Sequence, residues 1–165
     1  MKLSLKMEWA LEQLRNAAVR VTPVRERVLA FLAEHDVPAT LHEISSSEGL
    51  AGCFDDATVY RTLVLFVELD IVRQFQFRDR AISFLINTPG ECIGFLVCRA
   101  CGTVQRVPHS DEIRSLEEEM AERYGYRGIT HELELYGVCP RCEGQQGTGT
   151  KPTKLLTGMR LRRGA

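Results

Sequence analysis

The chain has 165 residues and a formal net charge of -1, with 44% hydrophobic and 26% charged residues. This balance is typical of a soluble globular protein with one or two small domains. The charge excludes a polybasic nucleic-acid binder but not specific DNA binding, which needs only a local basic surface. No apolar stretch approaches the roughly 20 residues that span a bilayer, and the start lacks a signal-peptide core. We therefore expect a cytoplasmic protein with no membrane partner.

The first third of the chain has the pattern of helices. Thr22 and Pro23 predict a helix start, because a hydroxyl N-cap precedes a proline at the first helical position, and the apolar spacing runs to about Glu34. Thr40 is expected to cap a shorter helix. Asp55 and the acidic residue after it open a further helix, where the positive end of the helix dipole favours carboxylates.

The helix after Asp55 carries one apolar stripe, and the exposed pair Tyr60 and Arg61 projects from another face. The stripe consists of Val59, Leu63, Phe66 and Leu69. Residues 72–77 then alternate in polarity, and residues 81–86 return as a second strand. Three helices followed by a hairpin are the order of a winged helix. Arg binds guanine edges or phosphate and Tyr packs on thymine methyls, although a solvated helix face has the same pattern.

The break at 88–90 is the expected domain boundary. Beyond it we predict strands at 95–97, 103–107 and 130–136, and a helix over 110–124 with an apolar face of Ile113, Leu116 and Met120. The organisation is therefore 1–88, 89–143 and a flexible basic tail over 144–165, which carries five Lys or Arg and no Asp or Glu. This tail either adds phosphate contacts or keeps the protein soluble.

Two C-x-x-C pairs carry the strongest chemical signal: Cys98, Cys101, Cys139 and Cys142. Each such turn brings two thiolates to one ion, and two turns complete a tetrahedral sulfur site that suits zinc. Gly102 follows the first pair, where positive φ is needed. Four thiolates leave no open position, so we expect one structural Zn²⁺ per chain. Redox-active or buried free thiols are the alternative.

These motifs make the chain similar to the ferric uptake regulator (Fur) family of bacterial metal-responsive repressors, including its zinc sensors, over about residues 16–142. The resemblance rests on Arg20-x-Thr22-Pro23-x-Arg25 and on the runs 57–63, 96–102 and 131–142. It implies an α+β protein, with an N-terminal winged helix-turn-helix domain for DNA and a C-terminal α/β dimerisation domain that carries the four-cysteine zinc site.

The resemblance further implies a sequence-specific transcriptional regulator, expected to be a repressor, that binds double-stranded DNA at an inverted repeat as a homodimer. The DNA contacts that it implies are Arg20, Thr58, Tyr60 and Arg61. The alternative is a dimeric scaffold or partner subunit that has lost DNA recognition. We do not expect an enzyme, because the sequence contains no Ser/His/Asp set, phosphate loop or open metal site.

The departures from the family concern its exchangeable regulatory metal. Where the family has a histidine-rich run before the first C-x-x-C, this chain has residues 92–95 (Cys-Ile-Gly-Phe). The position of a family carboxylate further upstream falls near Ile86 or Asn87, and the position of the family's interdomain histidine falls at Pro38. Isoleucine, glycine, phenylalanine and proline side chains do not ligate metals. We therefore expect weak or zinc-restricted sensing.

A remnant of a second zinc site is the remaining hypothesis, formed by Cys92, His131 and Glu112. In the alternative, His131 bonds locally and Cys92 fills an apolar space. Asp70 stands where the family commonly has glycine, so we expect a left-handed backbone there.

Overall fold

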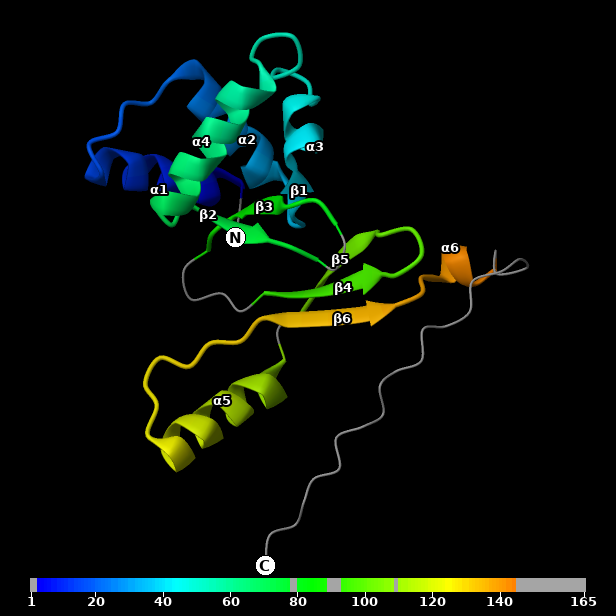
Figure 1. The fold of residues 1–165 in the computed structure, drawn as a ribbon. Helices are drawn as coiled ribbons and strands as arrows, with labels where there is room; N and C mark the ends of the chain where they lie inside the picture. The colour runs from blue at the N-terminus through cyan, green and yellow to red at the C-terminus, as the bar shows by residue number, and fades with distance from the viewer. Residues whose placement is uncertain (1–2, 78–79, 89–92, 109, 145–165) are drawn as a thin grey trace, which may run out of the picture.

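The computed structural model describes residues 3–77, 80–88, 93–108 and 110–144. Helices and two three-stranded sheets make up this part of the chain, which confirms the predicted α+β class (Figure 1). The elements in chain order are α1 (Leu3–Asn16), α2 (Pro23–Glu34), β1 (Ala39–Thr40), α3 (Leu41–Ser45), α4 (Asp56–Glu68), β2 (Val72–Phe75), β3 (Ser83–Ile86), β4 (Gly94–Cys98), β5 (Val104–Val107), α5 (Asp111–Tyr124), β6 (Leu133–Gly137) and α6 (Pro140–Glu143). None of the helices in these ranges has the length and apolarity needed to cross a bilayer.

The N-terminal unit, defined here as α1–α4 with β1–β3, is a winged helix. Helices α2, α3 and α4 begin where the sequence predicts. Thr22 is the N-cap of α2, with Pro23 at its first position. Thr40 and Glu43 form a capping box on α3, in which the Thr40 hydroxyl accepts from the Glu43 N–H at 3.2 Å and the Glu43 carboxylate accepts from the Thr40 N–H at 2.7 Å. The capping box satisfies backbone donors that a helix start otherwise leaves unpaired, whereas the Thr22 side chain makes no capping hydrogen bond.

The core of this unit joins the helices to one face of the wing. Its largest fully buried side chains come from α1, α2, α3, α4 and the segments beside them, and they are Leu14, Leu29, Leu32, Ile44, Leu50, Leu63, Phe66 and Ile71. Phe84 and Ile86 of β3 reach into the same core. Burial of each such side chain stabilises the fold by about 1.5–3 kcal/mol, which explains why the hairpin lies against the helices.

The wing sheet has the order β1-β3-β2, so β3 is its central strand. All four residues of β3 are buried, which means that both faces of this strand are covered. The ladder pairs Phe75 with Ser83 and ends there, so β2 is shorter than the predicted strand over 72–77. Asp70 has φ 55°, as expected for the turn between α4 and β2.

The second face of the wing packs on the sheet of the C-terminal unit, defined as β4–β6 with α5 and α6. We call the buried residues of this contact the inter-sheet cluster; they are Phe75, Phe77, Leu85, Ile93, Phe95 and Val97. Figure 1 shows the β2–β3 hairpin between the helices and the second sheet. A second apolar core, separate from the helical core, therefore lies between the two units.

The second sheet has the order β5-β4-β6, with β4 antiparallel to β5 and parallel to β6. A parallel neighbour requires a crossover, and α5 supplies it. The predicted apolar face of α5 is present but is not buried: no residue of this helix is buried, and Leu116 is 53% exposed. In Figure 1 α5 stands away from the sheet, so the described part of the chain does not cover that face of the helix.

Strand β1 and helix α6 were not predicted. The basic tail lies outside the described residues, apart from Gly144.

Candidate metal centre and nucleic-acid interface

Four thiols meet at one edge of the second sheet. Strand β4 ends at Cys98, whose ladder partner is Gly137 at the end of β6. Because the two strands are parallel, their carboxyl ends lie together, and the turns that follow bring the two C-x-x-C pairs face to face. The sulfurs of Cys98, Cys101, Cys139 and Cys142 all lie within 4.8 Å of one another.

Backbone hydrogen bonds shape both turns. The N–H of Cys98 donates to the carbonyl of Thr103, and the N–H of Gly102 donates to the carbonyl of Cys98, each at 2.9 Å. Gly102 has φ 77°, the left-handed conformation that the sequence predicts at this position. Cys139 is the N-cap of α6, and its carbonyl accepts from the N–H of Cys142 at 2.9 Å.

The cluster has the size of a tetrahedral zinc site. Zn–S bonds of about 2.3 Å place two ligand sulfurs about 3.8 Å apart, and the sulfurs of Cys101 and Cys139 are 3.7 Å apart. Four soft thiolates suit zinc, whereas magnesium and calcium prefer oxygen. A zinc ion here would have no open position, so its chemistry would be structural.

The electrostatics of the cluster are uneven. The backbone N–H of Cys101, and that of Cys139 at 3.3 Å, donate to the Cys98 sulfur and lower the pKa of Cys98 to about 5. Hydrogen bonds with the sulfurs of Cys101 and Cys139 hold the proton on Cys142 and raise its pKa to about 12. A metal ion binds the thiolate form, so metal binding would release a proton from the cluster.

The outer face of α4 is the candidate nucleic-acid interface. Val59, Thr62, Leu63 and Phe66 are buried, so the opposite side of the helix is turned to solvent. Tyr60 is 49% exposed there, and Arg61 is exposed beside it. Ala57 and Val64 belong to the same face by the i, i+3, i+4, i+7 spacing, and both are exposed. Ala57 and Val64 were not among the predicted DNA contacts, although that spacing identifies them.

The start of α4 is held rigidly by its cap. Asp55 accepts from the N–H of Thr58 at 2.8 Å and from its hydroxyl at 2.9 Å. These two hydrogen bonds lower the pKa of the Asp55 carboxyl. The Thr58 oxygen also accepts from Arg61 at 3.3 Å, so two of the predicted contact residues touch each other. Arg20, the other predicted contact, is exposed in the loop before α2, where its carbonyl accepts from Arg25.

Two residues of the hypothetical second zinc site, His131 and Glu112, have local hydrogen-bond partners. Cys92 lies outside the described residues. The Nδ1 of His131 lies 2.9 Å from the carboxylate of Glu117, a partner that the sequence analysis did not identify. Glu112 instead accepts from the hydroxyl of Ser110, and this bond lowers its pKa. Among the described residues, the four cysteines are the only group of three or more metal-binding side chains.

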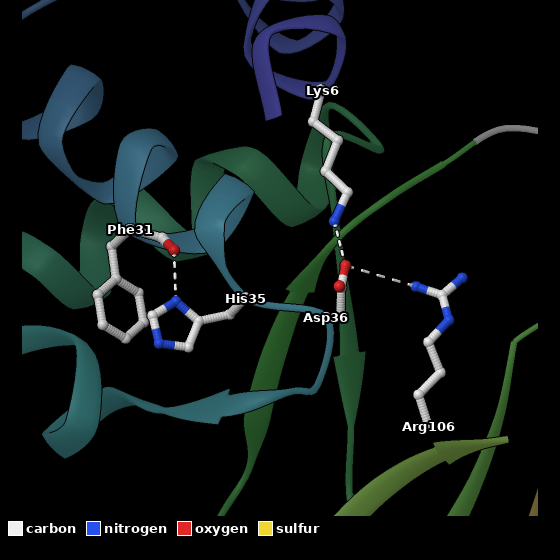
Figure 2. A network of polar contacts seen from close by, with 5 residues as sticks. All are labelled: Lys6, Phe31, His35, Asp36 and Arg106. Carbon is white, nitrogen blue, oxygen red and sulfur yellow. Dashed lines mark hydrogen bonds and ion pairs between the residues drawn. The ribbon is translucent and has the colours of Figure 1, made fainter. Parts of the chain in front are cut away.

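Most described positions where the Fur resemblance leads one to expect regulatory ligands are apolar and covered. Asn87 is polar and half-buried, and its side-chain amide donates to the Asp70 carbonyl at 2.9 Å. Pro38 and Gly94 are buried, Ile86 is 1% exposed, and Phe95 is 1% exposed. His35, three residues before Pro38, is used locally: its ring stacks on that of Phe31 with centroids 4.0 Å apart, and its Nδ1 lies 2.7 Å from the Phe31 carbonyl oxygen (Figure 2).

Comparison with known proteins gives consistent matches. Residues 16–136 match the Ferric uptake regulator family. The peroxide-responsive repressor PerR of Staphylococcus aureus is 29% identical over 143 residues, which cover 84% of this chain and 92% of the relative. The ferric uptake regulator of Vibrio cholerae, whose structure reveals a rearrangement of its DNA-binding domains, is 28% identical with a TM-score of 0.65 and covers 78% of this chain and 98% of its own. A zinc-bound manganese uptake regulator is 30% identical with a TM-score of 0.63, covering 79% and 98%.

Proposed function

The chain belongs to the ferric uptake regulator family, and on that basis we propose that it is a sequence-specific DNA-binding repressor that acts as a homodimer. Proteins of this family regulate transcription and are not enzymes, in agreement with the expectation from the sequence. The observation that carries the proposal is the winged-helix unit, which presents one polar, solvent-exposed helix face at Tyr60 and Arg61.

Arg61 and Tyr60 read the DNA in this proposal. Arg61 donates to a guanine edge or a phosphate in the major groove, and Tyr60 contacts a thymine methyl or a phosphate. In addition, Thr58 and Arg20 contact the phosphate backbone of the DNA. Ala57 and Val64 allow close approach of the helix, because they are uncharged and exposed on the same face.

A second copy of the chain covers the apolar surfaces that one chain leaves open. Leu96 of β4 and Leu135 of β6 are register partners, 41% and 43% exposed, and Leu116 of α5 is also exposed. Two-fold pairing through these surfaces sets the distance between the two α4 helices. Recognition helices of such a dimer enter successive major grooves about 34–36 Å apart, which requires an inverted-repeat operator.

The four cysteines hold one structural Zn²⁺ per chain in this proposal. The supporting observation is the 3.7 Å separation of the Cys101 and Cys139 sulfurs. The domains run over 1–88 for DNA and 89–143 for dimerisation and zinc, followed by the tail at 144–165. The binding free energy of zinc is then folding free energy of the second domain.

Sensing of an exchangeable metal is weak or restricted to zinc. The apolar side chains at Pro38, Ile86 and Phe95 support this, because they offer no ligand atom. A second zinc would use Cys92, His131 and a carboxylate, for which Glu112 is the original candidate and Glu117 the residue that touches His131.

Substitution of Arg61 tests the proposal against a scaffold that has lost DNA recognition. The full-length protein first selects its preferred duplex from a random pool. Arg61→Ala is then expected to weaken binding to that duplex by about 1–3 kcal/mol and to relax its sequence preference. Arg127→Ala, which removes an exposed arginine in the loop after α5, is the matched control. Equal affinity and selectivity of the two variants would favour the scaffold.

A further inference from the structure

The contact between the two units is built on aromatic rings. Phe95 of β4 meets Phe75 edge-on, with ring centroids 5.2 Å apart and an interplanar angle of 83°. It meets Phe77 in the same way, at 5.6 Å and 81°. Such edge-to-face pairs add directional attraction to the burial of apolar surface. Phe95 is 1% exposed and Phe77 is 1% exposed, so the contact excludes water.

Strand β3 contributes side chains both to the helical core and to the inter-sheet cluster. Leu85 lies in the inter-sheet cluster, whereas Phe84 and Ile86, its neighbours on either side, lie in the helical core. Successive side chains of a strand point to opposite faces. One strand therefore links the packing of the recognition helix to the packing of the second sheet.

Ion pairs also join the two units beside the inter-sheet cluster. Arg73 of β2 lies 2.9 Å from the carboxylate of Glu132, just before β6. Asp36, in the loop after α2, accepts from the ammonium of Lys6 at 2.6 Å and lies 3.9 Å from the guanidinium of Arg106 on β5 (Figure 2). The side chain of Lys6 is only 4% exposed, so this link extends from α1 to the second sheet through a largely buried ammonium.

The wing also touches the first cysteine turn, through the side chain of Arg80. The guanidinium of Arg80 lies where a Cβ at position 102 would stand. Gly102 directly follows Cys101. The absence of a side chain at Gly102 therefore allows the wing to lie directly against the first cysteine turn.

We propose that these direct contacts, centred on the inter-sheet cluster, hold the DNA-binding unit in one fixed orientation on the dimerising unit, so that DNA binding requires no exchangeable metal ion. The inference rests on the proposed DNA-binding function and deepens it. A ligand can shift an arrangement only by its differential affinity for two states. Here, among the described residues, Pro38, Ile86 and Phe95 stand where the resemblance places regulatory ligands, and their side chains pack and do not coordinate.

Two adjacent residues of β3 provide a matched pair of variants. Leu85→Ala removes a side chain from the inter-sheet cluster, and Ile86→Ala removes one of similar size from the helical core; the two are 2% and 1% exposed. Small-angle scattering of the full-length proteins measures the spread of distances between the units. We expect Leu85→Ala, and more strongly Leu85→Ala with Phe95→Ala, to broaden the distance distribution, whereas Ile86→Ala leaves it unchanged. Equal distributions for all variants would overturn the proposal.

DNA affinity provides the second measurement. The affinity of the wild-type protein for its selected duplex is to be measured with and without a chelator. The chelator concentration is chosen by native mass spectrometry so that the tightly held zinc stays in place. We expect less than about a twofold change in Kd for the wild type. For Phe95→Ala we expect at least about a tenfold weaker Kd, and Phe95→Leu, which keeps much of the apolar volume, should lie between the two. A loss of wild-type affinity of about tenfold on chelation, restored by added metal, would contradict the inference.

Failure of the function and failure of the inference are distinguishable. If the wild type selects no duplex, the proposed function is wrong, and the scattering comparison alone decides whether the units are held together. If the wild type binds DNA and chelation abolishes that binding, the function stands and the inference fails. If Leu85→Ala does not fold, Phe95→Leu takes its place in the scattering comparison, where unchanged distances at lowered thermal stability would also contradict the inference.

Discussion

Leu96 of β4 and Leu135 of β6 lie side by side on the sheet as register partners, and both are more than two-fifths exposed. The residues that flank Leu96 in β4, Phe95 and Val97, point to the opposite face and are buried in the inter-sheet cluster. One face of this sheet is therefore occupied within the chain, and the other presents apolar side chains to solvent. We therefore expect this face to be an interaction surface.

A charge on this face should prevent pairing of two copies. We expect Leu135→Glu to convert a dimer into a monomer, because a carboxylate would be buried without a partner in the interface. Sedimentation equilibrium measures the mass. Leu5→Glu, at an exposed leucine of α1, is the control and should leave the dimer intact. A dimer that persists in Leu135→Glu would place the interface elsewhere.

Loss of one zinc ligand should unfold the C-terminal unit and spare the helices of the N-terminal unit. Cys142→Ser removes one of four sulfurs, so zinc would be held by three sulfurs and would lose part of a binding free energy that is of the order of 10 kcal/mol for complete structural sites. Native mass spectrometry reports zinc, and hydrogen exchange reports which strands lose protection. Cys53→Ser, at an exposed cysteine outside the cluster, should change neither. A variant that lacks zinc and keeps full protection in β4–β6 would argue against a structural ion.

Gly102→Ala should destabilise the protein more than Gly128→Ala. Both glycines have positive φ, 77° and 66°, so both substitutions carry a similar backbone cost of about 1 kcal/mol. Only at Gly102 would the new methyl group meet the guanidinium of Arg80. Thermal unfolding of the two variants isolates that contact, and equal losses of stability would mean that Arg80 moves aside freely.

Acid should weaken the link between Lys6 and Asp36. The hydrogen bond from the Lys6 ammonium lowers the pKa of Asp36 below its ordinary value of 3.8. A carboxyl with a lowered pKa in the folded state stabilises that state above 3.8, and this contribution disappears as the pH falls through the folded-state pKa. Asp36 is largely exposed, so solvent screening limits the effect to less than about 1 kcal/mol.

Urea unfolding of the wild type and of Asp36→Asn, at a series of pH values from neutral downward, measures the contribution of the Lys6–Asp36 link to stability. The difference in unfolding free energy should be constant near neutrality and should shrink at acid pH. A difference that stays constant through the whole range would mean that Asp36 does not carry the link.

The local features of this fold were predictable because short-range chemistry determines them. Thr22-Pro23, the Thr40 cap and Asp55 specify helix starts through their own local preferences, and Asp70 adopts the left-handed turn that its position demands. The cysteine pairs were identified by spacing alone, and the structure brings all four sulfurs together. Their role as ligands stays a prediction.

Features that depend on distant partners were not predictable. Strand β1 has two residues, Ala39 and Thr40, and exists only because β3 pairs with it. The alternation of residues 72–77 identified a strand but not that Phe75 and Phe77 would pack on Phe95. The buried Lys6 has no signal in the sequence, since its partner Asp36 is thirty residues away.

The measurement that tests the account most directly is selection from a random duplex pool by the full-length, zinc-loaded protein in buffer without other metals. We expect enrichment of an inverted repeat whose half-sites are centred about 10 base pairs, or a multiple of that, apart. A pool that stays unenriched, or that yields a duplex only after a further metal is added, would contradict it.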